Sequence, residues 1–146
     1  MTAIDPRKLI LHAARDFRLA SQMLQAHFGE SRFPLRSTVV TTAFSVELYL
    51  KYLAATQGAD PPRGHDILKI FAALSPELQA LVRQHFTDPK PLDQVLKDNK
   101  AVFIDWRYIY ENQEGASLDF SSLSRLASAC DAAAQKATLS PLSGGG

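Results

Sequence analysis

Cysteine is nearly absent from the sequence, since Cys130 is the only one. A single cysteine excludes an intrachain disulfide and a cluster of thiolate metal ligands, and it is typical of a reducing cytoplasm. Long apolar runs are also missing, and the N-terminus lacks the basic and then apolar order of a signal peptide, so we predict no membrane span. We therefore expect a cytoplasmic protein in which Cys130 is an apolar core residue.

An excess of charge of one sign is likewise missing, because 16 Lys and Arg residues face 15 Asp and Glu residues, for a net charge of +1. This balance argues against a general electrostatic grip on nucleic acid, although a local basic patch is compatible with it. The sequence also has no Gly-rich phosphate loop, no paired-His metal spacing and no nucleophile elbow. We therefore expect no metal and no cofactor.

Strand alternation and internal repeats are absent, whereas helical periodicity runs through the chain. Apolar residues recur every three or four positions between Pro and Gly breaks, and the composition is that of one globular domain. The segments predicted to be helical are 6–29, 35–58, 67–74, 76–86, 92–115 and 119–137. We predict an all-α fold, an up-and-down bundle of about five helices over residues 1–139, followed by a flexible tail at 140–146.

The same periodicity predicts which side chains form the core. Those expected to be largely buried are Phe17, Phe44, Leu50, Phe103 and Trp106. Asn99 is the one polar member of the apolar stripe that begins at Leu92.

Glu47 and Lys51 lie one helical turn apart, in the favourable order of acid before base. They form either an ordinary surface ion pair or part of a half-buried site. The second interpretation follows from the helical row of Val40, Phe44 and Glu47, which places the carboxylate partly under neighbouring helices, where it needs a cation.

Arg107 is the cation that the sequence favours as the partner of Glu47, because it stands next to the apolar Trp106. A guanidinium pairs with a carboxylate or a phosphate through two hydrogen bonds and also stacks on aromatic rings. Arg107 therefore either joins two helices or contacts a phosphate.

His65 and Asp66 follow Gly64 at the end of a proline-rich loop. Asp66 is expected to cap the next helix, which would leave His65 as an ordinary loop residue. In the other interpretation, His65 lies at a helix N-terminus where it meets a phosphate.

Three blocks together resemble the HEPN family, the higher-eukaryote and prokaryote nucleotide-binding domains. They read AFSVELYLKYL at 43–53, GHDILKIF at 64–71 and FIDWRYIYE at 103–111. The resemblance spans about residues 5–138. It implies a helical bundle that often forms homodimers and belongs to prokaryotic defence or toxin–antitoxin systems.

Active members of this family are metal-independent ribonucleases, in which an Arg is followed after four to six residues by a His and the site forms across a dimer. Arg107 matches the arginine position, but Asn112 stands where the histidine would fall, and no His follows it. Asn cannot act as a general acid or base. The same spacing occurs from Arg7 to His12, where we interpret it as accidental.

Three hypotheses about function stay open. The first is a non-catalytic module that binds a nucleotide or an RNA phosphate, the second an interaction protein that forms a dimer, and the third a ribonuclease with a nonstandard site. The expected partners are a second copy, a nucleotide or RNA, and a toxin, an antitoxin or a nucleotidyltransferase. The candidate ligand-binding residues are Glu47, Lys51, His65, Asp66, Arg107 and Asn112.

Overall fold

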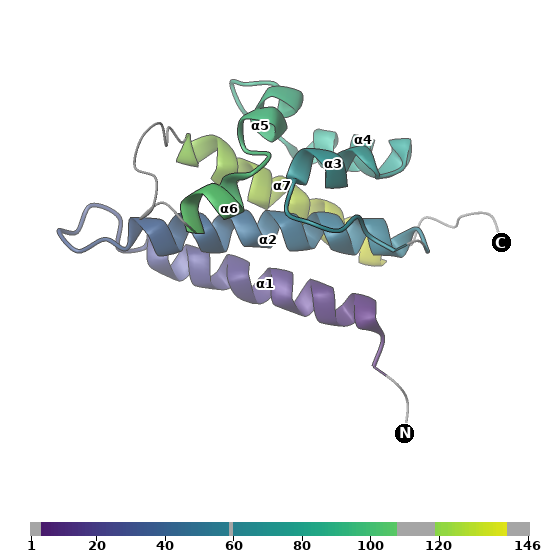
Figure 1. The fold of residues 1–146 in the computed structure, drawn as a ribbon, viewed down its shortest axis with the longest axis horizontal. Coiled ribbons are helices and arrows are strands. Elements are labelled where there is room, and N and C mark those ends of the chain that lie inside the picture. The colour runs from purple at the N-terminus through teal and green to yellow at the C-terminus, as the bar shows by residue number, and fades with distance from the viewer. Residues whose placement is uncertain (1–3, 59, 108–118, 140–146) are drawn as a thin grey trace.

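The computed structural model describes residues 4–58, 60–107 and 119–139, and within these ranges the regular structure is entirely helical (Figure 1). The helices are α1 (Pro6–Gln25), α2 (Leu35–Thr56), α3 (Ile67–Ala72), α4 (Pro76–His85), α5 (Leu92–Asp98), α6 (Val102–Arg107) and α7 (Phe120–Leu139). The predicted all-α class is confirmed. The predicted tail at 140–146 lies outside the described residues.

Helix α2 is the central element of the fold. It pairs along its length with α1, and its other sides contact α7, α6 and α3 (Figure 1). Helix α7 also packs against α4 and α5. The middle of α2 is therefore enclosed, and a polar residue placed there has to find its partners inside the protein.

Local sequence signals explain most of the helix starts. The side chain of Asp5 accepts a hydrogen bond from the backbone N–H of Arg7, and Pro6 occupies the first helical position. Ser75 caps α4 in the same way, by accepting a hydrogen bond from the N–H of Leu78, with Pro76 at the first helical position. The first helix ends at Gln25, earlier than the predicted end near Gly29, because turns fill the residues between them.

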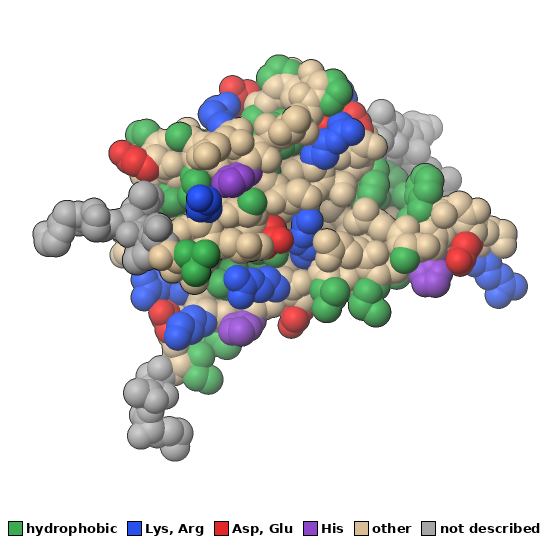
Figure 2. Space-filling view, turned by 180° about the vertical axis from the view of Figure 1, so that it is seen from behind, with side chains coloured by type: hydrophobic (Ala, Val, Ile, Leu, Met, Phe, Trp, Pro, Cys, Tyr) green, Lys and Arg blue, Asp and Glu red, His purple; other side chains and the backbone are tan. Residues whose placement is uncertain are grey.

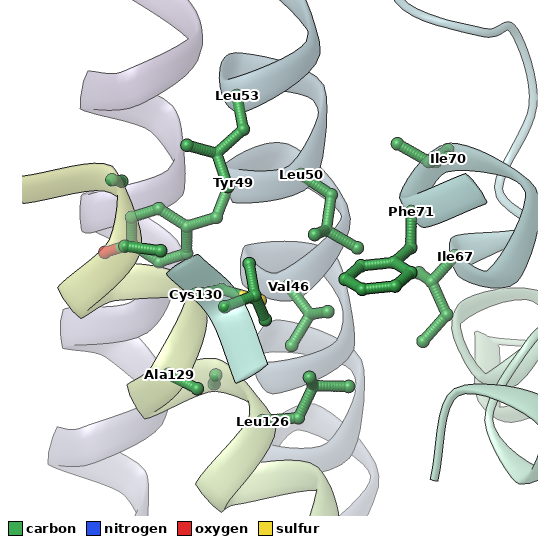
Figure 3. Close-up of a cluster of buried hydrophobic side chains, with 14 of the residues drawn as sticks. Val46, Tyr49, Leu50, Leu53, Ile67, Ile70, Phe71, Leu126, Ala129 and Cys130 are labelled. Carbon is green, nitrogen blue, oxygen red and sulfur yellow. The ribbon is translucent and has the colours of Figure 1, made fainter. Parts of the chain in front are cut away.

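The core surrounds α2 and takes side chains from every helix, and Figure 3 shows the part of it on α2, α3 and α7. The residues labelled there are Val46, Tyr49, Leu50, Leu53, Ile67, Ile70, Phe71, Leu126, Ala129 and Cys130, and all are buried. The prediction for Cys130 as an apolar core residue is confirmed, since it is fully buried, and this burial raises the pKa of its thiol to about 12.

The predicted core is confirmed for Leu50 and Phe103 but not for the other three aromatic residues. Phe17, Phe44 and Trp106 are only half-buried, although Phe44 and Trp106 still pack against the core. Phe44 of α2 and Phe17 of α1 contact each other edge-on, and both stay partly exposed.

The prediction of one continuous helix from 92 to 115 is wrong. The chain leaves helical geometry at Asn99 and becomes helical again in α6. The Asn99 side chain donates a hydrogen bond of 2.8 Å to the carbonyl of Val95, the same acceptor that its own backbone N–H uses. This local competition with the helical ladder ends α5. It is one reason why the described residues hold seven helices where we predicted about five.

None of the helices among the described residues has the length and apolar character needed to span a lipid bilayer.

Candidate functional site

Glu47 is a buried acid in the middle of α2, with 1% of its side chain exposed. Its Oε1 lies 2.7 Å from Nδ1 of His65, and its Oε2 lies 3.2 Å from Nζ of Lys51. Both oxygens of the carboxylate therefore have a partner. An unpaired carboxylate at this depth would be strongly destabilising, so these two contacts are what makes the burial of Glu47 tolerable.

Lys51 and His65 connect this buried acid to the surface. The side chain of Lys51 is 19% exposed and that of His65 is 34% exposed. An ammonium group has three N–H donors, and the contact with Glu47 uses one of them. The cluster of Glu47, Lys51 and His65 thus presents cationic and titratable groups at the surface while its acid stays buried. We call it the Glu47 cluster.

The loop after α2 brings His65 back onto that helix. Gly64 has a φ of +94°, a conformation that a residue with a side chain rarely adopts, and it turns the chain just before His65. The Asp66 carboxylate then accepts hydrogen bonds from the N–H groups of Leu68 and Lys69, at 3.0 and 3.2 Å, and starts α3. The expectation that Asp66 caps a helix is confirmed.

A row of aromatic rings holds His65 from the other side. Its imidazole lies 4.9 Å from the ring of Phe103 on α6, and Phe103 stacks on Phe44 of α2 at 4.8 Å with 25° between the ring planes. Phe17 of α1 meets Phe44 edge-on at 4.6 Å. The imidazole is therefore fixed by a hydrogen bond at Nδ1 and by a ring contact, which leaves it little freedom to rotate.

This geometry gives His65 a defined chemical role. When neutral, an imidazole that donates its Nδ1 hydrogen to a carboxylate carries a lone pair on Nε2, which can accept a proton or a hydrogen bond. When protonated, the same ring is a cation beside Lys51. The Glu47 cluster can thus bind an anion, or it can orient His65 as a base. Carboxylates that orient a catalytic base are common in proteins.

Arg107 is the last residue of α6, the helix that contacts α2, but its side chain lies outside the described residues, and so does the whole of Asn112. The sequence favoured Arg107 as the cation for Glu47. In the structure, Lys51 and His65 supply the partners of that carboxylate.

The contribution of Phe103 to the site was missed by the sequence analysis, which treated it only as a core residue. The signal was weak, because Phe103 and His65 are far apart in the sequence and no periodicity relates two different elements. Metal binding has no support among the described residues, where no group of three or more His, Cys, Asp or Glu side chains is placed to hold an ion.

Comparison with known proteins gives one match. The sequence model of the HEPN domain matches residues 7–128, a range that includes all six candidate ligand-binding residues. No curated protein and no solved structure matches the chain.

Proposed function

The chain belongs to the HEPN domain family, and we propose that it binds a nucleotide or an RNA phosphate at the Glu47 cluster together with Arg107. Membership supports a nucleotide- or RNA-related module. The finer proposal is a non-catalytic module of a prokaryotic defence or toxin–antitoxin system, a single cytoplasmic domain over residues 1–139, in which Asp66 and Asn112 flank the ligand.

The observation that supports this proposal most directly is the burial of the Glu47 carboxylate. Its two partners, Lys51 and His65, extend from it to the surface. A carboxylate that only strengthened the helix surface would be exposed, as ordinary pairs one turn apart are. Here the acid is 1% exposed and holds Lys51 and His65 in fixed positions. Prepositioned donors bind a phosphate without first losing side-chain entropy, which is the advantage that preorganisation gives.

The test is the substitution Arg107→Lys, because an ammonium cannot reproduce the two-pronged contact of a guanidinium. Arg36→Lys is the matched control, since Arg36 is exposed and makes no ion pair within the described part of the chain. If Arg107 recognises phosphate, Arg107→Lys should keep the melting temperature of the wild type while binding of a short RNA or a nucleotide falls. If Arg107 only joins helices, the melting temperature should fall instead. Unchanged stability and unchanged binding would contradict both roles.

A ribonuclease with a nonstandard site is a second candidate, favoured by the contact of 2.7 Å between Glu47 and His65. In this alternative, His65 supplies the base that Asn112 cannot. RNA cleavage in the presence of a metal chelator should then fall about 10²–10⁴-fold in His65→Gln, the usual contribution of a general base. Full stability with no cleavage by the wild-type protein would exclude this alternative.

An interaction protein that forms a homodimer or binds a partner toxin or antitoxin is a third candidate, favoured by exposed apolar side chains on α1 and the turn after it. Leu19, Met23 and Phe28 are exposed there, and Figure 2 shows apolar side chains along this edge. A homodimer should appear by light scattering at tens of micromolar and should dissociate in the variant Leu19→Glu/Met23→Glu. A monomer at that concentration would contradict it.

A further inference from the structure

A hollow of about 1080 Å³ lies away from the Glu47 cluster, between the N-terminal half of α1, the C-terminal ends of α2 and α7, and the first turn of α4. None of the six candidate ligand-binding residues lines it. Its volume is close to the upper end of the range for sites that enclose a small molecule.

One wall of this hollow is a stripe of basic side chains on α1. Lys8, His12 and Arg15 are spaced by four and then three residues, so they lie on one face of the helix, and all three line the hollow. All three are exposed, and within the part of the chain that the structure describes their side chains make no hydrogen bond and no ion pair. Figure 2 shows Lys, Arg and His side chains gathered over this half of α1.

Arg7 also borders the hollow, but its guanidinium is already engaged. It donates to both oxygens of Asp5, at 2.9 to 3.2 Å. Arg7 and His12 are five positions apart, which places their side chains about 140° apart around the helix. The Arg7 to His12 spacing is therefore not a ribonuclease pair on one face, and the basic side chains without a partner among the described residues belong to the stripe of Lys8, His12 and Arg15.

The other walls supply hydroxyl groups and an apolar floor. The hydroxyls of Tyr52 and Thr138 are hydrogen-bonded to each other at 2.7 Å, and Leu11 and Leu78 are buried beneath. Two acids also line the hollow: Glu77 in the first turn of α4, and Asp5, whose carboxylate accepts hydrogen bonds from Arg7. The site thus has basic side chains on one side and an apolar, hydroxyl-bearing surface on another. Of its two acids, Asp5 is paired with Arg7, and Glu77 at α4 has no ion pair among the described residues.

We propose that this hollow binds a small organic phosphate, with the phosphate on Lys8, His12 and Arg15 and the organic part against Tyr52 and the apolar floor. The unpaired cations of Lys8 and Arg15, with the His12 ring between them, are the recognition chemistry for a phosphate. A strand of RNA fits less well, because Asp16 directly follows the stripe on α1 and Glu77 faces it. These carboxylates repel the phosphates of a longer strand.

The experiment measures binding of adenosine monophosphate, with inorganic phosphate and a short RNA as comparison ligands, by isothermal titration calorimetry on the full chain. In Lys8→Gln/Arg15→Gln, affinity for the monophosphate should fall at least about tenfold, because two charge-assisted contacts are lost. The control Arg36→Gln/Lys69→Gln removes the same charge from exposed positions outside the hollow, where the described residues offer no ion pair. It should bind as the wild type does.

A gain of affinity provides the second arm. Glu77→Gln removes the one acid near α4, so it should tighten binding of the monophosphate a few-fold, a result that a damaged fold cannot produce. An equal loss in the α1 variant and the control, or no effect of Glu77→Gln, would overturn the proposal. A loss of short-RNA binding in Lys8→Gln/Arg15→Gln as large as the loss of monophosphate binding would also overturn it.

The outcome is independent of the proposal for the Glu47 cluster. Monophosphate binding in the hollow should persist in Arg107→Lys, and the binding of short RNA assigned to Arg107 should persist in Lys8→Gln/Arg15→Gln. If the hollow fails the test while Arg107→Lys still lowers binding, only the second site is refuted. The converse result refutes only the first.

Discussion

Removal of the buried carboxylate of Glu47 is the sharpest test of the site. Glu47→Ala leaves Lys51 and His65 without their common partner and leaves a cavity in α2. Breaking a buried ion pair costs about 3–5 kcal/mol when the remaining charge cannot reach water. Lys51 is 19% exposed and His65 is 34% exposed, so both can be partly rehydrated. With that discount and a contribution from the cavity, we expect a loss of about 3–4 kcal/mol.

Glu47→Gln separates the charge of this side chain from its shape. The amide oxygen still accepts the hydrogen of His65 Nδ1, so one of the two contacts remains and the loss should be only about 1–2 kcal/mol. The matched control is Glu30→Gln, since Glu30 pairs with His27 on the surface with both side chains more than half exposed. It should change stability by less than about 0.5 kcal/mol.

The assay is urea unfolding followed by circular dichroism. With a denaturant slope of about 2 kcal/mol per molar urea, Glu47→Ala should lower the midpoint by about 1.5–2 M and Glu47→Gln by about 0.5–1 M. A midpoint for Glu47→Ala within the range of the Glu30→Gln control would refute the argument, because it would mean that the carboxylate is neither buried nor needed by its partners.

Other parts of the structure give three further predictions. Leu50→Ala should lower stability by about 3–5 kcal/mol in the same urea assay, because Leu50 is fully buried, whereas Leu9→Ala, at an exposed position, should change it by less than about 0.5 kcal/mol. Cys130 should resist a thiol reagent at pH 8 until denaturant is added, since burial raises its pKa to about 12, and rapid labelling of the native protein would contradict its burial. Hydrogen bonds from the N–H of Ser122, from Lys90 and from the Ser122 hydroxyl lower the pKa of Asp119 from 3.8 to about 2. The stability that this carboxylate contributes is therefore present above pH 3.8 and is lost as pH falls through about 2. Asp119→Asn should therefore flatten the decline in melting temperature between pH 4 and pH 2, and an unchanged decline would count against this contribution.

Features that depend on neighbours in the sequence were predictable. Asp5, Ser75 and Asp66 cap the helices that follow them, because a cap needs only a side chain two or three residues before the amide that it accepts from. The contact between Glu47 and Lys51 follows in the same way from one turn of helix.

Features that depend on how the helices pack were not predictable. The spacing between Glu47 and His65 says nothing about a hydrogen bond, because the loop at Gly64 decides where the imidazole arrives. The sequence favoured Arg107 as the cation only because its neighbours are apolar, and apolar neighbours do not show which helix a side chain meets. The end of α5 was missed because Asn99 breaks the ladder through its own side chain while the apolar stripe continues past it.

During synthesis, the α1–α2 hairpin is made before His65 and Phe103 exist. At that stage Glu47 has only Lys51 beside it, so water must solvate the carboxylate on a face of α2 that is later enclosed. Hydration of this acid opposes premature closure of other apolar segments over the middle of α2. The arrival of His65 removes that opposition, and the ring of Phe103 then docks on both His65 and Phe44. The buried acid therefore leads us to expect that the loop reaches α2 before α6 packs on it.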